Sequence, residues 1–207
     1  MAEENPLLRR AYSLDGDPDK TRDVYADWAE SYDRDTANEF GYVAPGLAAS
    51  ELAELVSFDG VVLDAGCGTG LAGEELHRRG LMTIDGIDLS AEMLDVAAKK
   101  SVYRTLSVAD MTQRLGFADN TYDGVICVGT FTSGHVGPDA IDELLRITKP
   151  GAPVVVTVHE KVWDKDGYLN HLRKLERQGL MRVREIKDSP YHEKAGYRCQ
   201  LCILEAA

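Results

Sequence analysis

The sequence has no long apolar segment and few cysteines. None of its apolar runs approaches the roughly 20 residues that a helix needs to cross a bilayer. The acidic start, Met1-Ala2-Glu3-Glu4, lacks the apolar core of a signal peptide, so we expect a cytoplasmic protein. The 4 cysteines among 207 residues are too few and too scattered for the disulfide framework of a secreted scaffold.

Basic side chains are outnumbered by acidic ones. The chain has 23 Lys and Arg against 35 Asp and Glu, which gives a net charge of −12. Proteins that bind nucleic acid concentrate positive charge against the phosphates, and anionic membranes attract basic clusters in the same way. We therefore expect neither nucleic acid nor a membrane as a partner. The sequence does not indicate an oligomeric state.

Predicted strands and helices alternate along most of the chain. Short apolar runs predict strands at 61–63, 83–88, 102–109, 123–128 and 154–158. Segments between and after them predict helices at 71–79, 90–100, 138–149 and 168–175. The two final strands, 181–187 and 197–204, have no helix between them and should pair antiparallel. This order predicts right-handed βαβ units in a Rossmann-like α/β fold, a doubly wound and mostly parallel sheet.

The chain before the first predicted strand is expected to differ from the core. We divide the single structural domain into an N-terminal arm with lid or substrate helices, 1–58, and a core, 59–207. Residues 1–16 show no periodicity, which predicts a mobile arm. Asp17 followed by proline is a typical helix start, and a second amphipathic helix is predicted over 47–56.

The strongest motif is VVLDAGCGTG at 61–70, where a buried strand enters a loop with Gly66, Gly68 and Gly70. Glycine lets a ligand approach the backbone closely. The dinucleotide spacing G-x-G-x-x-G fits only from Gly68, which begins two residues late after the strand. Asp64 at the strand end would repel a pyrophosphate and attract a cation. S-adenosylmethionine fits, because it has an amino group and a sulfonium and no phosphate.

Two more aspartates follow the next two predicted strands. Asp88 stands where an acid in doubly wound nucleotide sites accepts hydrogen bonds from ribose hydroxyls. Leu89 and Met93 would flank the adenine. Asp110 can accept the adenine amino group, and Met111 offers a backbone N–H. The alternative, in which Asp88 only caps the next helix, is disfavoured because a serine already stands at the cap.

Taken together, these motifs resemble those of the class I S-adenosylmethionine-dependent methyltransferases: LDAGCGTG, GIDLS, VADM, YDGVICVGT and KPGAPVVVTV. The resemblance covers about residues 20–207. Further segments resemble the methyltransferase-like protein 27 group, the Williams–Beuren-region methyltransferases: YADWAESYD, GIDLSAEML and VGTFTSGHVGP. The resemblance implies a seven-stranded sheet whose last strand runs antiparallel between the fifth and sixth. It also implies S-adenosylmethionine as methyl donor and S-adenosylhomocysteine as product.

The resemblance also places cofactor contacts along the strand ends. They are Asp64, Gly66, Gly68, Gly70, Asp88, Leu89, Asp110 and Met111. Val128 and Gly129 should border the methionine portion, and Tyr25 and Tyr32 should close over it. The alternative for the two tyrosines is a core-facing stripe. Cys67, inside the loop, is counted with the cofactor-contacting residues and is interpreted as packing, not as a nucleophile.

One departure bears on the methyl acceptor. The fourth strand ends in Cys127-Val128-Gly129-Thr130, not in the Asn/Asp-Pro-Pro-Tyr/Phe tetrapeptide of relatives that methylate adenine or glutamine. This argues against planar amines in DNA or protein glutamine. Together with the short chain and its acidity, it favours a small-molecule acceptor.

Methyl transfer from a sulfonium is an in-line displacement with a neutral leaving group, so proximity can supply most of the rate. A base is needed only for a protonated acceptor. His135, in the loop after the fourth strand, is the candidate, because its ordinary pKa of about 6.5 suits proton transfer; alternatively it only bonds the backbone. Candidate acceptor-pocket residues, each alternatively packing, are Tyr42, Phe131, His159 and Trp163.

Two other interpretations concern Cys199-x-x-Cys202 and the remaining functional classes. Strand residues three apart point to opposite faces, so we expect no metal site at these cysteines. A nicotinamide-dependent oxidoreductase using Gly68, Gly70 and Gly73 is the first alternative function. The second is a module that binds S-adenosylmethionine without turnover.

Overall fold

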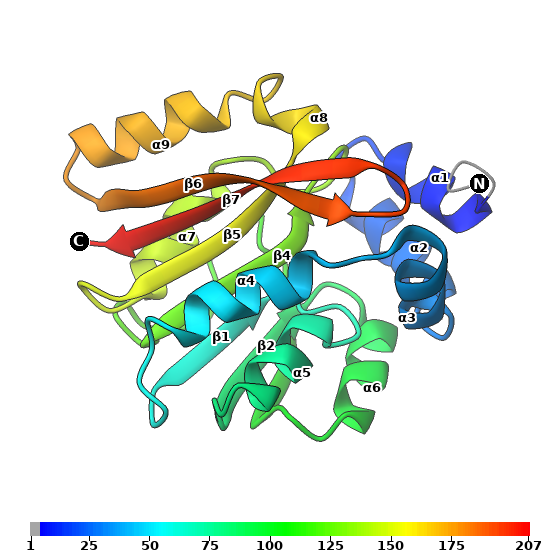
Figure 1. Ribbon diagram of the computed structural model, residues 1–207, viewed down its shortest axis with the longest axis horizontal. Helices are drawn as coiled ribbons and strands as arrows, with labels where there is room; N and C mark the ends of the chain where they lie inside the picture. Colours follow the sequence, from blue (N-terminus) through cyan, green and yellow to red (C-terminus); the bar gives the residue numbers. More distant parts are fainter. Residues whose placement is uncertain (1–4) are drawn as a thin grey trace.

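A seven-stranded sheet organises the fold of residues 5–207, which the computed structural model describes (Figure 1). The strands are β1 (Val61–Ala65), β2 (Thr83–Asp88), β3 (Thr105–Val108), β4 (Gly124–Phe131), β5 (Pro153–His159), β6 (Met181–His192) and β7 (Tyr197–Ala206). Their order is β3-β2-β1-β4-β5-β7-β6, and β7 runs antiparallel to both β5 and β6. The predicted doubly wound α/β sheet is confirmed, with the last strand between the fifth and sixth.

Burial explains why the central strands are apolar throughout. All seven residues of β5 are buried, and β1 is buried from its second residue onward. Strands covered by helices on both faces have no solvent side, so they show no apolar–polar alternation. The strands β1, β4 and β5 therefore lie in the interior, whereas β3 is an edge strand and is largely exposed. The carboxyl ends of the parallel strands β1 to β5 meet at one edge.

Helices cover the two faces of the sheet with separate cores. On one face lie α4 (Ala44–Ala53) and α5 (Leu71–Arg78), and on the other lie α7 (Ala140–Ile147) and α9 (Tyr168–Arg177). α6 (Ala91–Lys99) flanks β2 and β3, and a short helix that was not predicted, α8 (Glu160–Trp163), follows β5. None of the helices in the described part of the chain is long and apolar enough to span a bilayer.

The N-terminal region is more ordered than predicted. Three helices, α1 (Pro6–Tyr12), α2 (Pro18–Trp28) and α3 (Tyr32–Asp35), precede a π-helical turn at Thr36–Phe40. The expectation of an arm without structure is wrong for α1, because the Asn5 side chain accepts hydrogen bonds from the next helical N–H groups, a strong helix start. The rest of that expectation, Met1–Glu4, lies outside the described residues.

These N-terminal helices lie beyond the carboxyl ends of the parallel strands (Figure 1). Asp33 of α3 accepts a hydrogen bond from Thr69 in the glycine loop and pairs with Lys100 at 2.8 Å. The Gly16 N–H donates to the Gly134 carbonyl at 3.0 Å. Two points of attachment thus hold the N-terminal helices over the sheet edge where ligands bind in open α/β folds.

Candidate functional site

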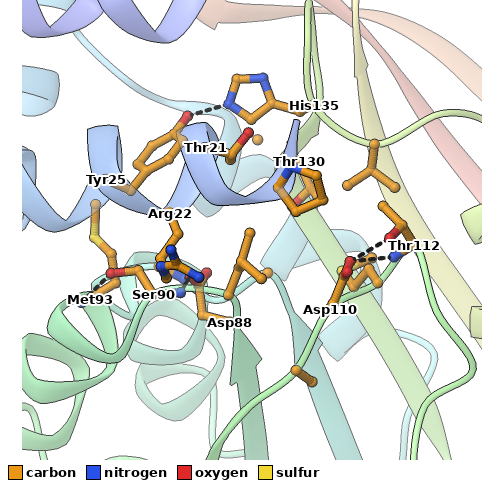
Figure 2. Close-up of a pocket in the computed structure, with 18 of the residues that line it drawn as sticks. Thr21, Arg22, Tyr25, Asp88, Ser90, Met93, Asp110, Thr112, Thr130 and His135 are labelled. Atoms are coloured by element: carbon orange, nitrogen blue, oxygen red, sulfur yellow. Dashed lines mark hydrogen bonds between the residues drawn. The ribbon is translucent and has the colours of Figure 1, made fainter. Parts of the chain in front are cut away.

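A large cavity lies at this edge, between α2 and the carboxyl ends of β1 to β4 (Figure 2). Its volume is about 820 Å³, including its opening to solvent. Twelve of the residues predicted from the sequence line it: Tyr25, Tyr32, Gly66, Gly68, Asp88, Leu89, Met93, Asp110, Met111, Val128, Gly129 and His135. We call it the main cavity. The glycine loop and three strand ends thus meet in one place.

The glycine loop is held by bonds to the neighbouring strand. The N–H groups of Gly66 and Cys67 both donate to the Ile87 carbonyl, at 2.8 and 2.9 Å. Gly66 has φ +70°, and a Cβ there would collide with the hydroxyl of Thr130. Only glycine allows this close approach. The Cys67 thiol is buried, and burial raises its pKa, which agrees with packing and not with nucleophilic attack.

Asp88 organises the floor of the main cavity. Its Oδ2 accepts the Gly68 N–H at 2.8 Å, and its Oδ1 accepts the Ser90 N–H at 2.9 Å. Ser90 in turn caps α6 by accepting the Met93 N–H. Asp88 therefore supports the start of the following helix and also lines the main cavity. Burial raises the pKa of Asp88, because the ionised form is desolvated.

Asp110 and its neighbours form a second wall. Its Oδ1 accepts hydrogen bonds from the N–H and the hydroxyl of Thr112, at 2.8 and 2.7 Å. Figure 2 shows Asp110 across the cavity from Asp88. Met93 and Met111 are buried and add apolar surface to the same space. An apolar slot with carboxylates at its ends suits a flat ring that carries polar groups.

Asp64 lies in an adjoining side cavity of about 310 Å³, which shares Tyr32, Gly66, Gly68 and Val128 with the main cavity. Its Oδ2 accepts the Tyr103 hydroxyl at 2.6 Å. Its Oδ1 is buried and has no partner among residues 5–207. Burial raises the pKa of Asp64 to about 7. An unpartnered buried carboxylate oxygen is a strong site for a cation.

Cys67 and Tyr42 also line the side cavity. Gly70 lines neither cavity, because it begins α5 and packs against the Tyr103 ring. The predicted contact of Gly70 with a ligand therefore has no support from these two cavities.

His135 and Tyr25 form a hydrogen-bonded pair at the main cavity (Figure 2). The Nδ1 of His135 lies 2.8 Å from the Ser133 carbonyl, which only accepts, so we assign the ring proton to Nδ1. Nε2 then accepts the Tyr25 hydroxyl at 2.8 Å. Burial lowers the pKa of His135, so the ring is neutral at pH 7. The backbone contact expected as the alternative is therefore present, and the other ring nitrogen, Nε2, is bound to Tyr25.

Three predicted acceptor-pocket residues lie away from the main and side cavities. Phe131 is buried against Tyr168, because β4 turns every second side chain toward α7 and α9. Trp163 stacks on the same tyrosine. His159 is 1% exposed and lies behind Tyr12. The three residues were expected to line the acceptor pocket. In this structure they pack against other aromatic side chains and line neither cavity.

Sequence reasoning missed several residues that line the main cavity. Thr21 and Arg22 reach it from α2 (Figure 2). Arg22 also pairs with Asp19 at 2.8 Å. Nothing in the spacing of a short amphipathic helix tells which polar side chains face a ligand, so no sequence signal was available.

The two cysteines of β7 point to opposite faces of the sheet. Cys199 and Cys202 belong to the cores on opposite faces of the sheet, as their spacing predicted. Among the described residues, no group of three or more His, Cys, Asp or Glu side chains is arranged to hold a metal ion.

Comparison with known proteins places these motifs in a family. Residues 62–151 match a family model described as a methyltransferase domain. Methyltransferase-like protein 27 of Homo sapiens is 36% identical over 168 residues, which cover 76% of this chain and 68% of that protein. The 18S rRNA (guanine-N(7))-methyltransferase RID2 of Arabidopsis thaliana is 45% identical over 73 residues, 34% of this chain and 25% of that protein.

A solved structure agrees at the level of the fold. Magnesium protoporphyrin IX methyltransferase, ChlM, from Synechocystis PCC 6803 with bound SAH superposes with a TM-score of 0.68 and 18% identity. The match covers 92% of this chain and 100% of that one. The family model and the sequence relative confirm the predicted family: this chain belongs to the class I S-adenosylmethionine-dependent methyltransferases.

Proposed function

We propose that this chain transfers a methyl group from S-adenosylmethionine to a small-molecule acceptor. The observation that carries the proposal is the arrangement of Asp64, Asp88 and Asp110 around one glycine loop, with two connected cavities between them. Family membership supports the reaction class. The small size of the cavities and the net charge of −12 support a small acceptor.

The residues fit this cofactor in three places. The unpartnered Oδ1 of Asp64 is suited to the α-amino group, and Asp88 is suited to the ribose hydroxyls. Asp110, Met111 and the apolar side chains beside them would hold the adenine. When bound, S-adenosylmethionine supplies an electrophilic methyl group on a sulfonium.

The chain's own chemistry consists of positioning and proton removal. The walls of the main cavity hold the reactants together and keep water out, which can provide most of the rate. His135 is the base: its neutral Nε2 takes a proton from a protonated acceptor, directly or through the Tyr25 hydroxyl that it binds. The Ser133 carbonyl stabilises the imidazolium by accepting its Nδ1–H.

A nucleic-acid acceptor is the second candidate, because RID2 is named as an rRNA methyltransferase. That similarity spans only 34% of this chain. The excess of acidic residues would repel phosphates. A small molecule is therefore the better supported acceptor. Membership of the methyltransferase family likewise disfavours the nicotinamide-dependent alternative.

Calorimetry tests the proposal. S-adenosylmethionine, S-adenosylhomocysteine and NADH are titrated into the wild-type protein, Asp88→Ala, and Asp95→Ala as a matched control at an exposed aspartate on α6. We expect micromolar binding of the first two ligands, lost in Asp88→Ala and kept in Asp95→Ala. Binding of NADH alone would overturn the proposal. Cofactor binding without turnover of any compound in a metabolite screen would favour the non-catalytic module.

A further inference from the structure

A third cavity lies behind the main one, between the N-terminal helices and the end of β6. We call it the aromatic chamber and define it by six of its side chains: Tyr12, Tyr25, Trp28, Tyr32, Tyr191 and His192. Its volume is about 360 Å³, including its opening to solvent, which is less than half that of the main cavity. It is the part of the described structure that the proposed cofactor site leaves unexplained.

The aromatic chamber shares a wall with the main cavity. Tyr25, Tyr32, Gly129 and His135 line both spaces. The shared wall contains the proposed base, so a molecule in the chamber lies next to both the base and the cofactor cavity. This is where a methyl acceptor has to lie.

The chamber contains polar atoms without partners. The Thr132 hydroxyl, the His192 Nδ1 and the Tyr12 hydroxyl are buried, and none has a hydrogen-bond partner within residues 5–207. Thr132 and His192 are only 7% and 5% exposed. Buried polar groups are almost always paired, because leaving one unpaired costs free energy. Three in one cavity point to a ligand that hydrogen-bonds to them.

A local irregularity of β6 buries two side chains of the aromatic chamber, Tyr191 and His192. The pairing of β6 with β7 shifts register between Pro190 and His192. As a result Tyr191 and His192, which are adjacent in sequence, are both buried, although neighbours in a regular strand face opposite sides. Such bulges commonly redirect a side chain next to a functional site.

The chamber favours an uncharged ligand. Among the described residues, no Asp, Glu, Lys or Arg lines it. Burial lowers the pKa of His192 to about 3 and lowers that of His135, so both rings are neutral at pH 7. An ion moved from water into this space would lose its hydration without gaining an opposite charge.

The walls favour a flat ring. Tyr25 and Trp28 stack with their planes 22° apart, Tyr32 meets Trp28 edge to face, and Tyr25 and Tyr32 are tilted against each other. Aromatic walls bind planar rings by stacking and by edge-to-face contact. The unpaired hydroxyl and imidazole groups then require oxygen groups on that ring.

We infer that the aromatic chamber binds the methyl acceptor and that the acceptor is an uncharged, single-ring phenol with more than one oxygen substituent. The inference rests on the proposed function and specifies its substrate class. Thr132, His192 and Tyr12 recognise the oxygen substituents, and the Tyr25–His135 pair faces the hydroxyl that loses its proton.

Binding in the presence of S-adenosylhomocysteine tests this without turnover. Catechol is the probe, and benzoate and benzylamine are its charged counterparts. Calorimetry on the protein saturated with S-adenosylhomocysteine should show binding of catechol, and binding of benzoate and benzylamine at least tenfold weaker. If S-adenosylhomocysteine itself does not bind, the proposed function fails. If it binds and catechol does not, or the charged rings bind equally well, the inference alone is overturned.

Two variants localise the probe. Thr132→Val and Tyr12→Phe each remove one unpaired oxygen and keep the side-chain shape. Each should weaken catechol binding at least threefold with the affinity for S-adenosylhomocysteine unchanged. Thr148→Val is the matched control, because that hydroxyl is buried elsewhere and donates to the Leu144 carbonyl. It should leave catechol binding unchanged.

Thermal melting of the same variants tests whether the Thr132 hydroxyl has no hydrogen-bond partner in the folded protein. Removing an unpaired buried hydroxyl should leave Tm equal or higher in Thr132→Val, whereas Thr148→Val loses a made hydrogen bond and should melt lower. A lower Tm in Thr132→Val, with catechol binding unchanged, would show that this hydroxyl has a structural partner and would overturn the assignment.

Discussion

The affinity for S-adenosylhomocysteine should depend on pH through Asp64. Burial raises the pKa of this carboxyl group to about 7, so the free protein holds much of it neutral at physiological pH. A cationic α-amino group needs the ionised form, and its binding therefore expels a proton from the neutral fraction. Affinity should rise as pH rises toward the pKa and should level off above it.

The size of the effect follows from the pKa. With a pKa of about 7, the ionised fraction of Asp64 is about one eleventh at pH 6 and about one half at pH 7. The affinity should therefore increase about fivefold between these values. About 0.9 proton should be released per ligand bound at pH 6. The predicted rise in affinity can be tested only up to about pH 7, because a free α-amino group loses its own charge near pH 8.

Calorimetry in two buffers with different ionisation heats measures both quantities. Asp64→Asn should bind weakly and show no pH dependence over this range. Tyr103→Phe removes the phenol that donates to Oδ2 at 2.6 Å and favours the ionised carboxylate, so its midpoint should move to higher pH. Wild-type affinity that is flat between pH 6 and pH 7, with no proton released, would refute the role of Asp64.

Three further predictions concern the N-terminal helices. Trp28→Ala removes a side chain that is 2% exposed and donates a hydrogen bond to Asp35 at 3.0 Å. It should lower the free energy of unfolding by about 3–5 kcal/mol in urea titrations. A loss under about 1 kcal/mol would contradict this packing. Asp33→Ala removes the bonds to the glycine loop and Lys100, so S-adenosylhomocysteine should bind several-fold more weakly in calorimetry; unchanged affinity would show that the attachment does not matter. Gly134→Ala places a methyl group against a backbone carbonyl of the arm, so proteolysis around Gly16 should accelerate, and an unchanged rate would argue against this attachment.

The sequence was sufficient to predict the strands and the residues at their ends, because local pattern and strand order determine both. Asp88 and Asp110 were predicted at the ends of successive parallel strands, which share one edge of the sheet, and the structure places both at the main cavity. Phe131 was misplaced because a strand's period does not say which face receives which residue. α1 was missed because its short apolar stripe has meaning only against Trp28 and Phe40.

The aromatic chamber shows where sequence reasoning ends. Tyr12 and Tyr191 stand 179 positions apart in the numbering, and only the tertiary fold brings both to one wall. In a regular strand Tyr191 and His192 would face opposite sides of the sheet. The register shift between Pro190 and His192 breaks this alternation. No short sequence motif predicts the long-range contact or the register shift.

The origin of the chamber's walls has an evolutionary consequence. The matched family domain, 62–151, contains the glycine loop, Asp88 and Asp110, but nine of the twelve residues lining the chamber lie outside it. With the acceptor in the chamber, as inferred above, selection can alter the two ends of the chain and change what is methylated, while the methyl donor stays the same. Relatives that share the central segment can differ in acceptor, and their substrates are better compared through the flanking residues.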